Sequence, residues 1–166
     1  MPIPKRSAAI KSCLRRILAG AALASMVAPT SWAQVSVAID NVQSLSFGRF
    51  AAGSGGSVTV STNGNRNAGG GVALIRSSQG TAAQFTVSGD PNATYTIQLP
   101  DNDFVSLTGP GIGMFINNFL STPSGVGGQL GADGSQPLSV GGTLNVGSGQ
   151  APGSYSGTFS VTVSYN

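Results

Sequence analysis

Side chains capable of chemistry are few beyond residue 33. From residue 34 onward the sequence has no Lys, Glu, His or Cys. Serines are plentiful, but a serine nucleophile needs a neighbouring base such as His or Lys, and neither occurs in this part of the chain. The same absences remove thiolate and imidazole metal ligands. We therefore expect no catalytic residues, no cofactor and no enzyme activity.

The closest spacing of acids is Pro100-Asp101-Asn102-Asp103, in which two carboxylates stand two residues apart. Calcium loops use such spacing, but they need further oxygen ligands and usually a bidentate acid later in the loop. The residues that follow return at once to a strand pattern, which favours an Asx-type turn. A turn is our interpretation, and calcium at Asp101 and Asp103 stays open at this point.

Two glycine-rich segments superficially resemble phosphate-binding loops, which need a helix N-terminus behind them. Residues 109–113 (GPGIG) precede a strand-like pattern, and residues 64–69 (GNRNAG) lack the Lys-Ser/Thr of a P-loop. We interpret both as turns. Three arginines against five aspartates leave a net charge of −2 from residue 34 onward, so nucleic-acid binding by phosphate neutralisation is not expected either.

The elements that position these residues are predicted to be strands, because no helical period follows residue 33. About nine or ten short runs alternate apolar and polar residues between turn residues. The runs cover 35–39, 45–50, 57–61, 72–75, 83–87, 94–99, 104–107, 114–120, 138–146 and 155–165. Gly141 and Gly142 interrupt the run at 138–146 and indicate a bulge or two short strands. This pattern predicts one all-β domain over residues 34–166, a β-sandwich or small barrel.

The first 33 residues follow the pattern of a secretory signal peptide. Five Lys and Arg residues precede an apolar run at 17–27 (ILAGAALASMV), which is too short to span a bilayer. Ser31 and Ala33 then provide the small residues of a cleavage site before Gln34. We expect residues 1–33 to be removed and residues 34–166 to be exported to the periplasm, cell surface or medium without a membrane span.

The final run is the most informative strand in the sequence. Its apolar members alternate with serines and threonines, and they are Phe159, Val161, Val163 and Tyr165. An uncharged, proline-free strand at a sheet edge invites pairing with another chain. A shorter alternating run lies near the predicted cleavage site, at Val35, Val37 and Ile39. We predict that this N-terminal run acts as a donor strand and that the C-terminal strand lines the groove that receives it.

Five motifs, kept in order, cover nearly all of residues 34–166. They are Leu45-Ser46-Phe47-Gly48 with Phe50, Gly70-Gly71-Val72, residues 83–89 (AQFTVSG), residues 91–97 (PNATYTI) and residues 150–159 (QAPGSYSGTF). This set resembles the bacterial exported family called domain of unknown function 4402. The name of that family implies no activity.

The C-terminal strand is also similar to that of chaperone–usher pilus subunits, which share a glycine fourteenth from the end and a penultimate tyrosine. Gly153 and Tyr165 occupy those positions. The resemblance implies an immunoglobulin-like (pilin-like) β-sandwich that is completed by the N-terminal strand of the next subunit. It also implies self-assembly with a periplasmic chaperone and an usher as partners. The chain lacks the cysteine pair that many such subunits carry.

These observations lead us to expect an exported, non-enzymatic structural or adhesive surface protein, a pilin-like subunit that associates by β-strand addition. The alternative is a self-complete secreted β-sandwich binding module, for glycans or as a matrix component. A pilin-like subunit has an open groove and a detachable N-terminal strand. A binding module has a closed core and an aromatic platform on its surface.

Overall fold

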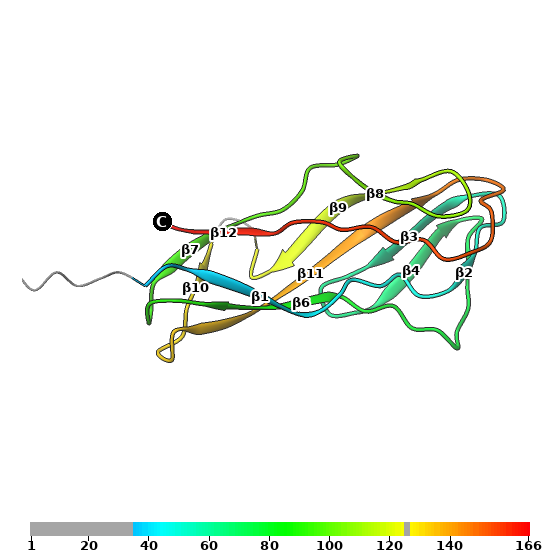
Figure 1. The fold of residues 1–166 in the computed structure, drawn as a ribbon. Coiled ribbons are helices and arrows are strands. Elements are labelled where there is room, and N and C mark those ends of the chain that lie inside the picture. Colours follow the sequence, from blue (N-terminus) through cyan, green and yellow to red (C-terminus); the bar gives the residue numbers. More distant parts are fainter. Residues whose placement is uncertain (1–34, 125–126) are drawn as a thin grey trace, which may run out of the picture. The chain divides into compact units, whose positions relative to one another are not determined.

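The computed structural model describes residues 35–124 and 127–166. The signal peptide and the cleavage residues Ser31, Ala33 and Gln34 lie outside the described residues. Strands, turns and irregular segments make up the described part of the chain, which contains no helix (Figure 1). The predicted all-β sandwich class is therefore confirmed.

The described ranges contain twelve strands. They are β1 (Ala38–Gln43), β2 (Phe50–Ala51), β3 (Gly56–Val60), β4 (Arg66–Gly70), β5 (Ala73–Leu74), β6 (Ala83–Ser88), β7 (Thr94–Gln98), β8 (Val105–Leu107), β9 (Met114–Thr122), β10 (Gly128–Gln129), β11 (Ser135–Val146) and β12 (Thr162–Tyr165).

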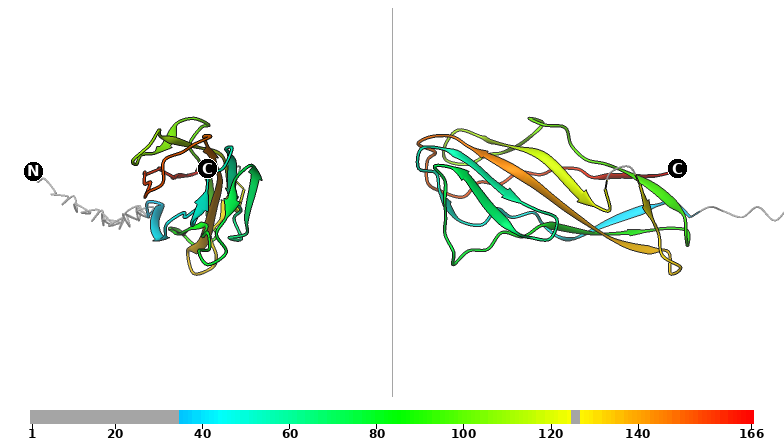
Figure 2. Two further views of the ribbon diagram at one scale, coloured as in Figure 1. Left: turned by 90° about the vertical axis from the view of Figure 1, so that its right-hand side faces the viewer. Right: turned by 180° about the vertical axis from the view of Figure 1, so that it is seen from behind.

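The long strand β11 organises the larger sheet, and it crosses the domain from end to end (Figure 2). One edge of β11 pairs first with β6 and then with β3, while its other edge pairs with β9. The outer neighbours are β1 beside β6, β4 beside β3 and β8 beside β9. A smaller sheet has the order β10-β7-β12, and β2 pairs with β5.

This strand order is that of an immunoglobulin-like sandwich. Constant-type immunoglobulin domains place strands ABED in one sheet and CFG in the other. Here β1, β6, β11 and β9 follow the order A-B-E-D within a seven-stranded sheet that also contains β3, β4 and β8, and β7 and β12 correspond to the C-F pair. Among the described residues, no strand occupies the position of G beside β12.

Alternating side chains from both sheets fill the core, as period-two strands require. Val58, Val87, Leu138 and Leu144 are fully buried, and they come from β3, β6 and β11. Tyr95 closes the core from the smaller sheet and is equally buried. The sandwich is therefore held together by apolar packing across two layers and by its backbone ladders.

The predicted irregularity at Gly141 and Gly142 is real, although β11 continues through it as one strand. The pairing of β11 with β9 shifts register between Gly141 and Thr143, and the extra residue belongs to β9. Asn118, with a φ of 50°, lies in that bulge. The ring of Phe119 then lies over Gly142, where a Cβ atom would approach Cδ1 of the ring to 3.4 Å. A Cβ atom at Gly142 would also approach Cγ2 of Ile116 to 3.1 Å, so a side chain at this position would require Ile116 to shift slightly.

Two strand predictions are corrected by the structure. Residues 64–69 were expected to be a turn, but β4 begins at Arg66, and the turn lies earlier, where Gly64 N donates to Ser61 O over 2.9 Å. Most of β4 is exposed and small, so it shows no apolar alternation. The run at 155–165 was expected to be one strand, yet only Thr162–Tyr165 is paired as β12.

Tyr95 provides a test of the core packing. Its hydroxyl donates a hydrogen bond to Gln136 Oε1 over 2.7 Å, and burial raises the pKa of this phenol above its ordinary value of 10.0. Since the unfolded chain ionises more readily, stability falls as the pH rises past 10.0. We expect Tyr95→Phe to lower the free energy of unfolding by about 1 kcal/mol at pH 7 and to weaken its alkaline decline. Urea titrations at pH 7 to 11 measure both effects, and an unchanged alkaline slope would contradict the assignment.

Candidate functional site: an unpaired edge of the sandwich

Tyr155 fixes the turn that leads into the C-terminal segment. Its hydroxyl donates to Ala151 O and accepts from Gly111 N and from Gln150 Nε2, each over 2.9 Å. A tyrosine that bonds the backbone a few residues upstream, at the E–F corner, is a hallmark of immunoglobulin-like sandwiches. Gly153 lies in the same turn with a φ of 151°, and Pro110 leaves no room for a Cβ atom there. The turn therefore requires both Gly153 and Tyr155.

The C-terminal strand is paired along one edge only. In β12, Val163 lies opposite Ile97 of β7, and Asn166 N donates to Thr94 O over 3.2 Å. Because backbone groups alternate between the two edges of an antiparallel strand, those of Val163 and Tyr165 point away from β7. Nothing in the described part of the chain pairs with this second edge.

The unpaired edge extends upstream of β12. Ser156 and Thr108 exchange two backbone hydrogen bonds of 2.8 and 3.0 Å, so the segment is attached to β8 at that point. Between this bridge and β12, residues 157–161 have no backbone hydrogen bond to any described residue. A run of five extended residues thus leaves its donors and acceptors free on both edges, where a buried or paired strand would satisfy them.

The first strand faces this edge. β1 pairs with β6 alone, and it lies next to β12 without forming a ladder with it (Figure 1). Two edge strands from opposite sheets therefore lie side by side without pairing with each other. We call the strip between β1 with residues 44–52 and residues 150–165 the edge groove, which is hollowed where residues 46–52 face residues 150–155.

Half-buried apolar side chains line the edge groove. They pack against the core without being covered by it, and they are Val37, Ile39, Phe159, Val161, Val163 and Tyr165. The ring of Phe159 lies 5.2 Å from that of Phe119 and 6.4 Å from that of Phe85, measured between centroids. The C-terminal segment is therefore anchored to the larger sheet while its apolar face stays accessible from the groove.

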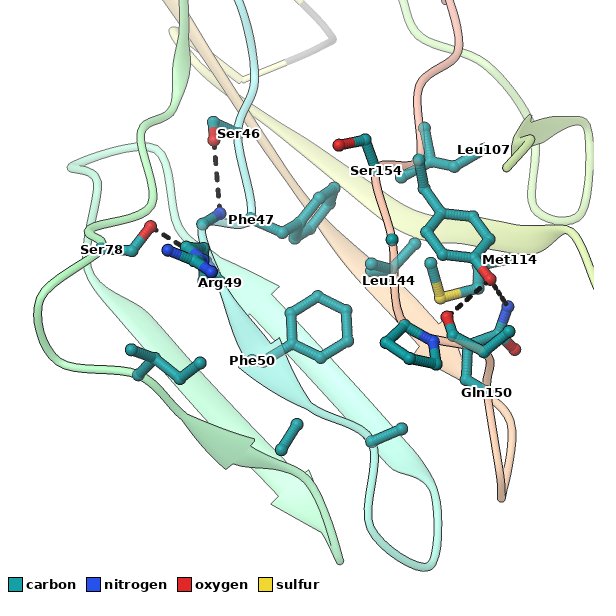
Figure 3. Close-up of a pocket in the computed structure, with 18 residues that line it drawn as sticks. Ser46, Phe47, Arg49, Phe50, Ser78, Leu107, Met114, Leu144, Gln150 and Ser154 are labelled. Carbon is teal, nitrogen blue, oxygen red and sulfur yellow. Dashed lines mark hydrogen bonds between the residues drawn. The ribbon is translucent and has the colours of Figure 1, made fainter. Parts of the chain in front are cut away.

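The end of the edge groove beside β2 opens into a hollow of about 920 Å³ (Figure 3). Phe47 and Phe50 form one wall, the turn at 150–155 forms the other, and Leu107 and Met114 lie beneath them. Arg49 lies on the rim, where its backbone N–H donates to Ser78 Oγ over 3.0 Å. This hollow is wide enough for a bulky apolar side chain.

A second hollow, of about 630 Å³, lies on the other side of the unpaired residues 157–161. The loop between β7 and β8 forms its far wall, with Leu99, Pro100 and Phe104. The C-terminal segment therefore leaves its bridge to Thr108 after Ser156 and reaches β7 only at Thr162, so neither sheet pairs with its backbone in between.

The structure places Phe159, Val161, Val163 and Tyr165 at alternate, half-buried positions, and it places the N-terminal residues differently from a free strand. Val35 is exposed, whereas Val37 and Ile39 pack against the core. Ile39 lies in β1, opposite Val87 of β6, so this part of the segment is already a strand of its own domain. Its role as a donor to another copy stays a prediction.

Sequence reasoning missed the hollow. Phe47, Phe50 and Gln150, which line it, were identified from the sequence only as members of family motifs. The spacing Pro152-Gly153 followed by Tyr155 is the signal that could have located the corner, because it combines a turn with a tyrosine that can reach back to the backbone.

Asp103 and its neighbour Asn102 hold the loop between β7 and β8 in place. Asp103 N donates to Asn117 Oδ1 over 2.8 Å, and Asn117 Nδ2 donates to Asp103 Oδ1 over 2.9 Å. Asn102 Oδ1 accepts from Asn118 N over 2.7 Å, next to the bulge of β9. This pattern agrees with the predicted turn. In residues 35–124 and 127–166, no three His, Cys, Asp or Glu side chains gather as metal ligands would.

The fold and the unpaired edge of β12 together define an immunoglobulin-like β-sandwich. In this sandwich, no described strand occupies the position beside β12. The chain belongs to the family described as Domain of unknown function (DUF4402), whose model matches residues 37–165. No curated protein matches the chain, and no solved structure matches it. The search for membrane spans finds no helix of sufficient length and apolar character among the residues described.

Proposed function

We propose that the protein is an exported, non-enzymatic structural subunit of the bacterial surface, pilin-like in its assembly. It associates by β-strand addition at the edge groove, after export through the signal at residues 1–33. A periplasmic chaperone and an usher are its proposed partners. The observation that carries this proposal is the unpaired second edge of the C-terminal strand, at the position that strand G fills in a complete sandwich.

The energetics favour an incoming strand. Its main chain would satisfy the free backbone groups of Val161, Val163 and Tyr165, and alternate side chains would cover the half-buried face. Full burial of one aliphatic side chain contributes roughly 1.5–3 kcal/mol, whereas ordering one residue costs about 1–2 kcal/mol. An added strand therefore stabilises the domain only if it brings several apolar side chains and its hydrogen bonds together.

A self-complete binding module is the second candidate, and one observation favours it. Phe104 and Phe115 are 81% and 45% exposed, and they point outward from the β8–β9 pair. Exposed aromatic side chains can form a platform for a sugar ring. Loss of glycan binding in a Phe104→Ser variant would support this module, provided that the wild-type protein binds a glycan at all.

The experiment that tests strand addition appends a donor to the intact chain. Residues 34–43 (QVSVAIDNVQ) are repeated after Asn166 behind a short Gly/Ser linker, so that the extra strand can fold back along residues 157–165. A ten-residue strand reaches about 33 Å, enough to cover the unpaired edge. We expect the melting temperature to rise by about 5 °C and self-association to disappear, since about 4 °C corresponds to 1 kcal/mol for a domain of this size.

The matched control carries Val37→Asp and Ile39→Asp in the appended copy only, so its length and linker are unchanged. We expect this control to melt and associate like the unmodified chain. A self-complete sandwich predicts that neither appended strand changes the melting temperature. Deletion of residues 34–40 would not separate the two functions, because it also removes part of β1 from its ladder with β6.

A further inference from the structure

The charged residues of the domain are separated along β11. Ser135, at one end of β11, lies opposite Ser88, and Asp90 and Asp133 flank this end. Their loops are joined there, because Gly89 N donates to Gly134 O over 2.9 Å. Asp40 lies on β1 close by, opposite Thr86. We call this end, defined by Asp40, Asp90 and Asp133, the acidic end.

All three arginines of the described part lie toward the other end. Arg66 is opposite Val60, which in turn is opposite Gly142 of β11. The guanidinium of Arg66 donates to Arg49 O over 3.2 Å and to Ile75 O over 3.0 Å. These two hydrogen bonds hold the segments that carry Arg49 and Arg76 next to Arg66. We call this end, defined by Arg49, Arg66 and Arg76, the basic end.

The distance between the two ends keeps their charges from neutralising one another. Seven residues of β11 separate Ser135 from Gly142, which is about 24 Å at the rise of an antiparallel strand. That distance is several times the Debye length of about 8 Å at physiological ionic strength. The remaining acids, Asp101 and Asp103, lie at the same level along β11 as Gly142 but on its other side, because Asp103 is bonded to Asn117 of β9, which is opposite Thr143.

We propose that the acidic end of one copy docks on the basic end of the next, so that electrostatics sets a head-to-tail direction of assembly. This inference rests on the proposed strand addition and names its partner, a second copy of the chain. It requires a heterologous contact, in which two different surfaces meet and the chain of copies continues. Each copy then keeps one free acidic end and one free basic end for further growth.

The position of the donor segment and the groove supports this direction. Val35 and Val37 enter β1 at the acidic end, since Ala38 lies opposite Ser88. The hollow of the edge groove opens at the basic end, with Arg49 on its rim. Among the described residues only 35–37 precede β1, and they reach about 10 Å when extended. A donor this short, inserted into the hollow of a neighbour, brings Asp90 and Asp133 of its own domain against that neighbour's arginines.

Charge reversal tests the contact on the full chain, purified after export. The variants are Arg76→Glu, Asp133→Arg and the double variant, and both sites are exposed and lie outside the lining of the hollow. Each single variant places like charges in the contact, so we expect its association constant to fall about tenfold in sedimentation equilibrium. The double variant restores opposite charges, and we expect association within about threefold of wild type. Leu120→Glu is the control for added charge, because Leu120 is 62% exposed and lies on β9, across β11 from the strands that carry Arg66.

Three results would overturn the proposed contact. The first is an association constant of the single variants equal to that of wild type. The second is a double variant whose association constant falls by the product of the two single losses. The third is a wild-type chain that stays monomeric at low and high salt. The appended-strand experiment decides strand addition separately, through the melting temperature of a single copy. If the appended strand raises the melting temperature but charge reversal does not change association, the charged contact is wrong and strand addition is still supported.

Discussion

Phe159→Ala is expected to lower the free energy of unfolding by about 3 kcal/mol, which corresponds to a melting temperature about 12 °C lower. The ring of Phe159 packs against Phe119 of β9 and Phe85 of β6, within 5.2 and 6.4 Å between centroids. It joins the unpaired residues 157–161 to the larger sheet, and no backbone hydrogen bond within the described residues compensates for its loss. Thermal melts and urea titrations of the purified variant measure the effect.

Phe104→Ala is the matched control, since it removes the same atoms from a ring that is 81% exposed. We expect the control to change stability by less than about 0.5 kcal/mol. Equal losses in the two variants would mean that the C-terminal segment is held by contacts other than the Phe159 ring. They would also remove the argument that this segment forms one wall of a groove.

Period-two alternation located most strands because it reports directly which side chains a sheet buries. Residues 83–87 and 94–99 were found nearly in full as β6 and β7, whose inward positions are Val87, Tyr95 and Ile97. The same signal failed for β4, where glycine, alanine and asparagine lie at an exposed edge. The two glycines of β11 led to the prediction that the bulge lies in that strand. The structure places the extra residue in β9, the strand paired with β11 at this point.

Alternation alone could not say which strand edges are paired. The run at 155–165 alternates throughout, yet its hydrogen bonds begin only at Thr162, because pairing depends on where β7 and β8 lie in three dimensions. Val37 and Ile39 carry the same pattern and lie within or beside a paired strand. The candidate residues were therefore identifiable from the sequence, while the groove, its hollow and the separation of charge depend on the topology.

Tyr155→Phe is expected to lower the free energy of unfolding by about 2 kcal/mol, or about 8 °C in melting temperature. The substitution keeps the ring and removes only the hydroxyl, which bonds Ala151 O, Gly111 N and Gln150 Nε2. Those bonds tie the turn at 150–155 to the loop between β8 and β9. Because that turn is one wall of the hollow, the variant is also expected to respond less to the appended donor strand.

Tyr165→Phe is the matched control, because its hydroxyl accepts a single hydrogen bond, from Asp90 N over 2.7 Å. A neutral intramolecular hydrogen bond contributes about 0.5–1.5 kcal/mol, so we expect the control to lose about half as much stability as Tyr155→Phe. Equal losses would show that the hydroxyl of Tyr155 does not hold the corner. An undiminished response of Tyr155→Phe to the appended strand would show that the groove forms without the hydroxyl of Tyr155.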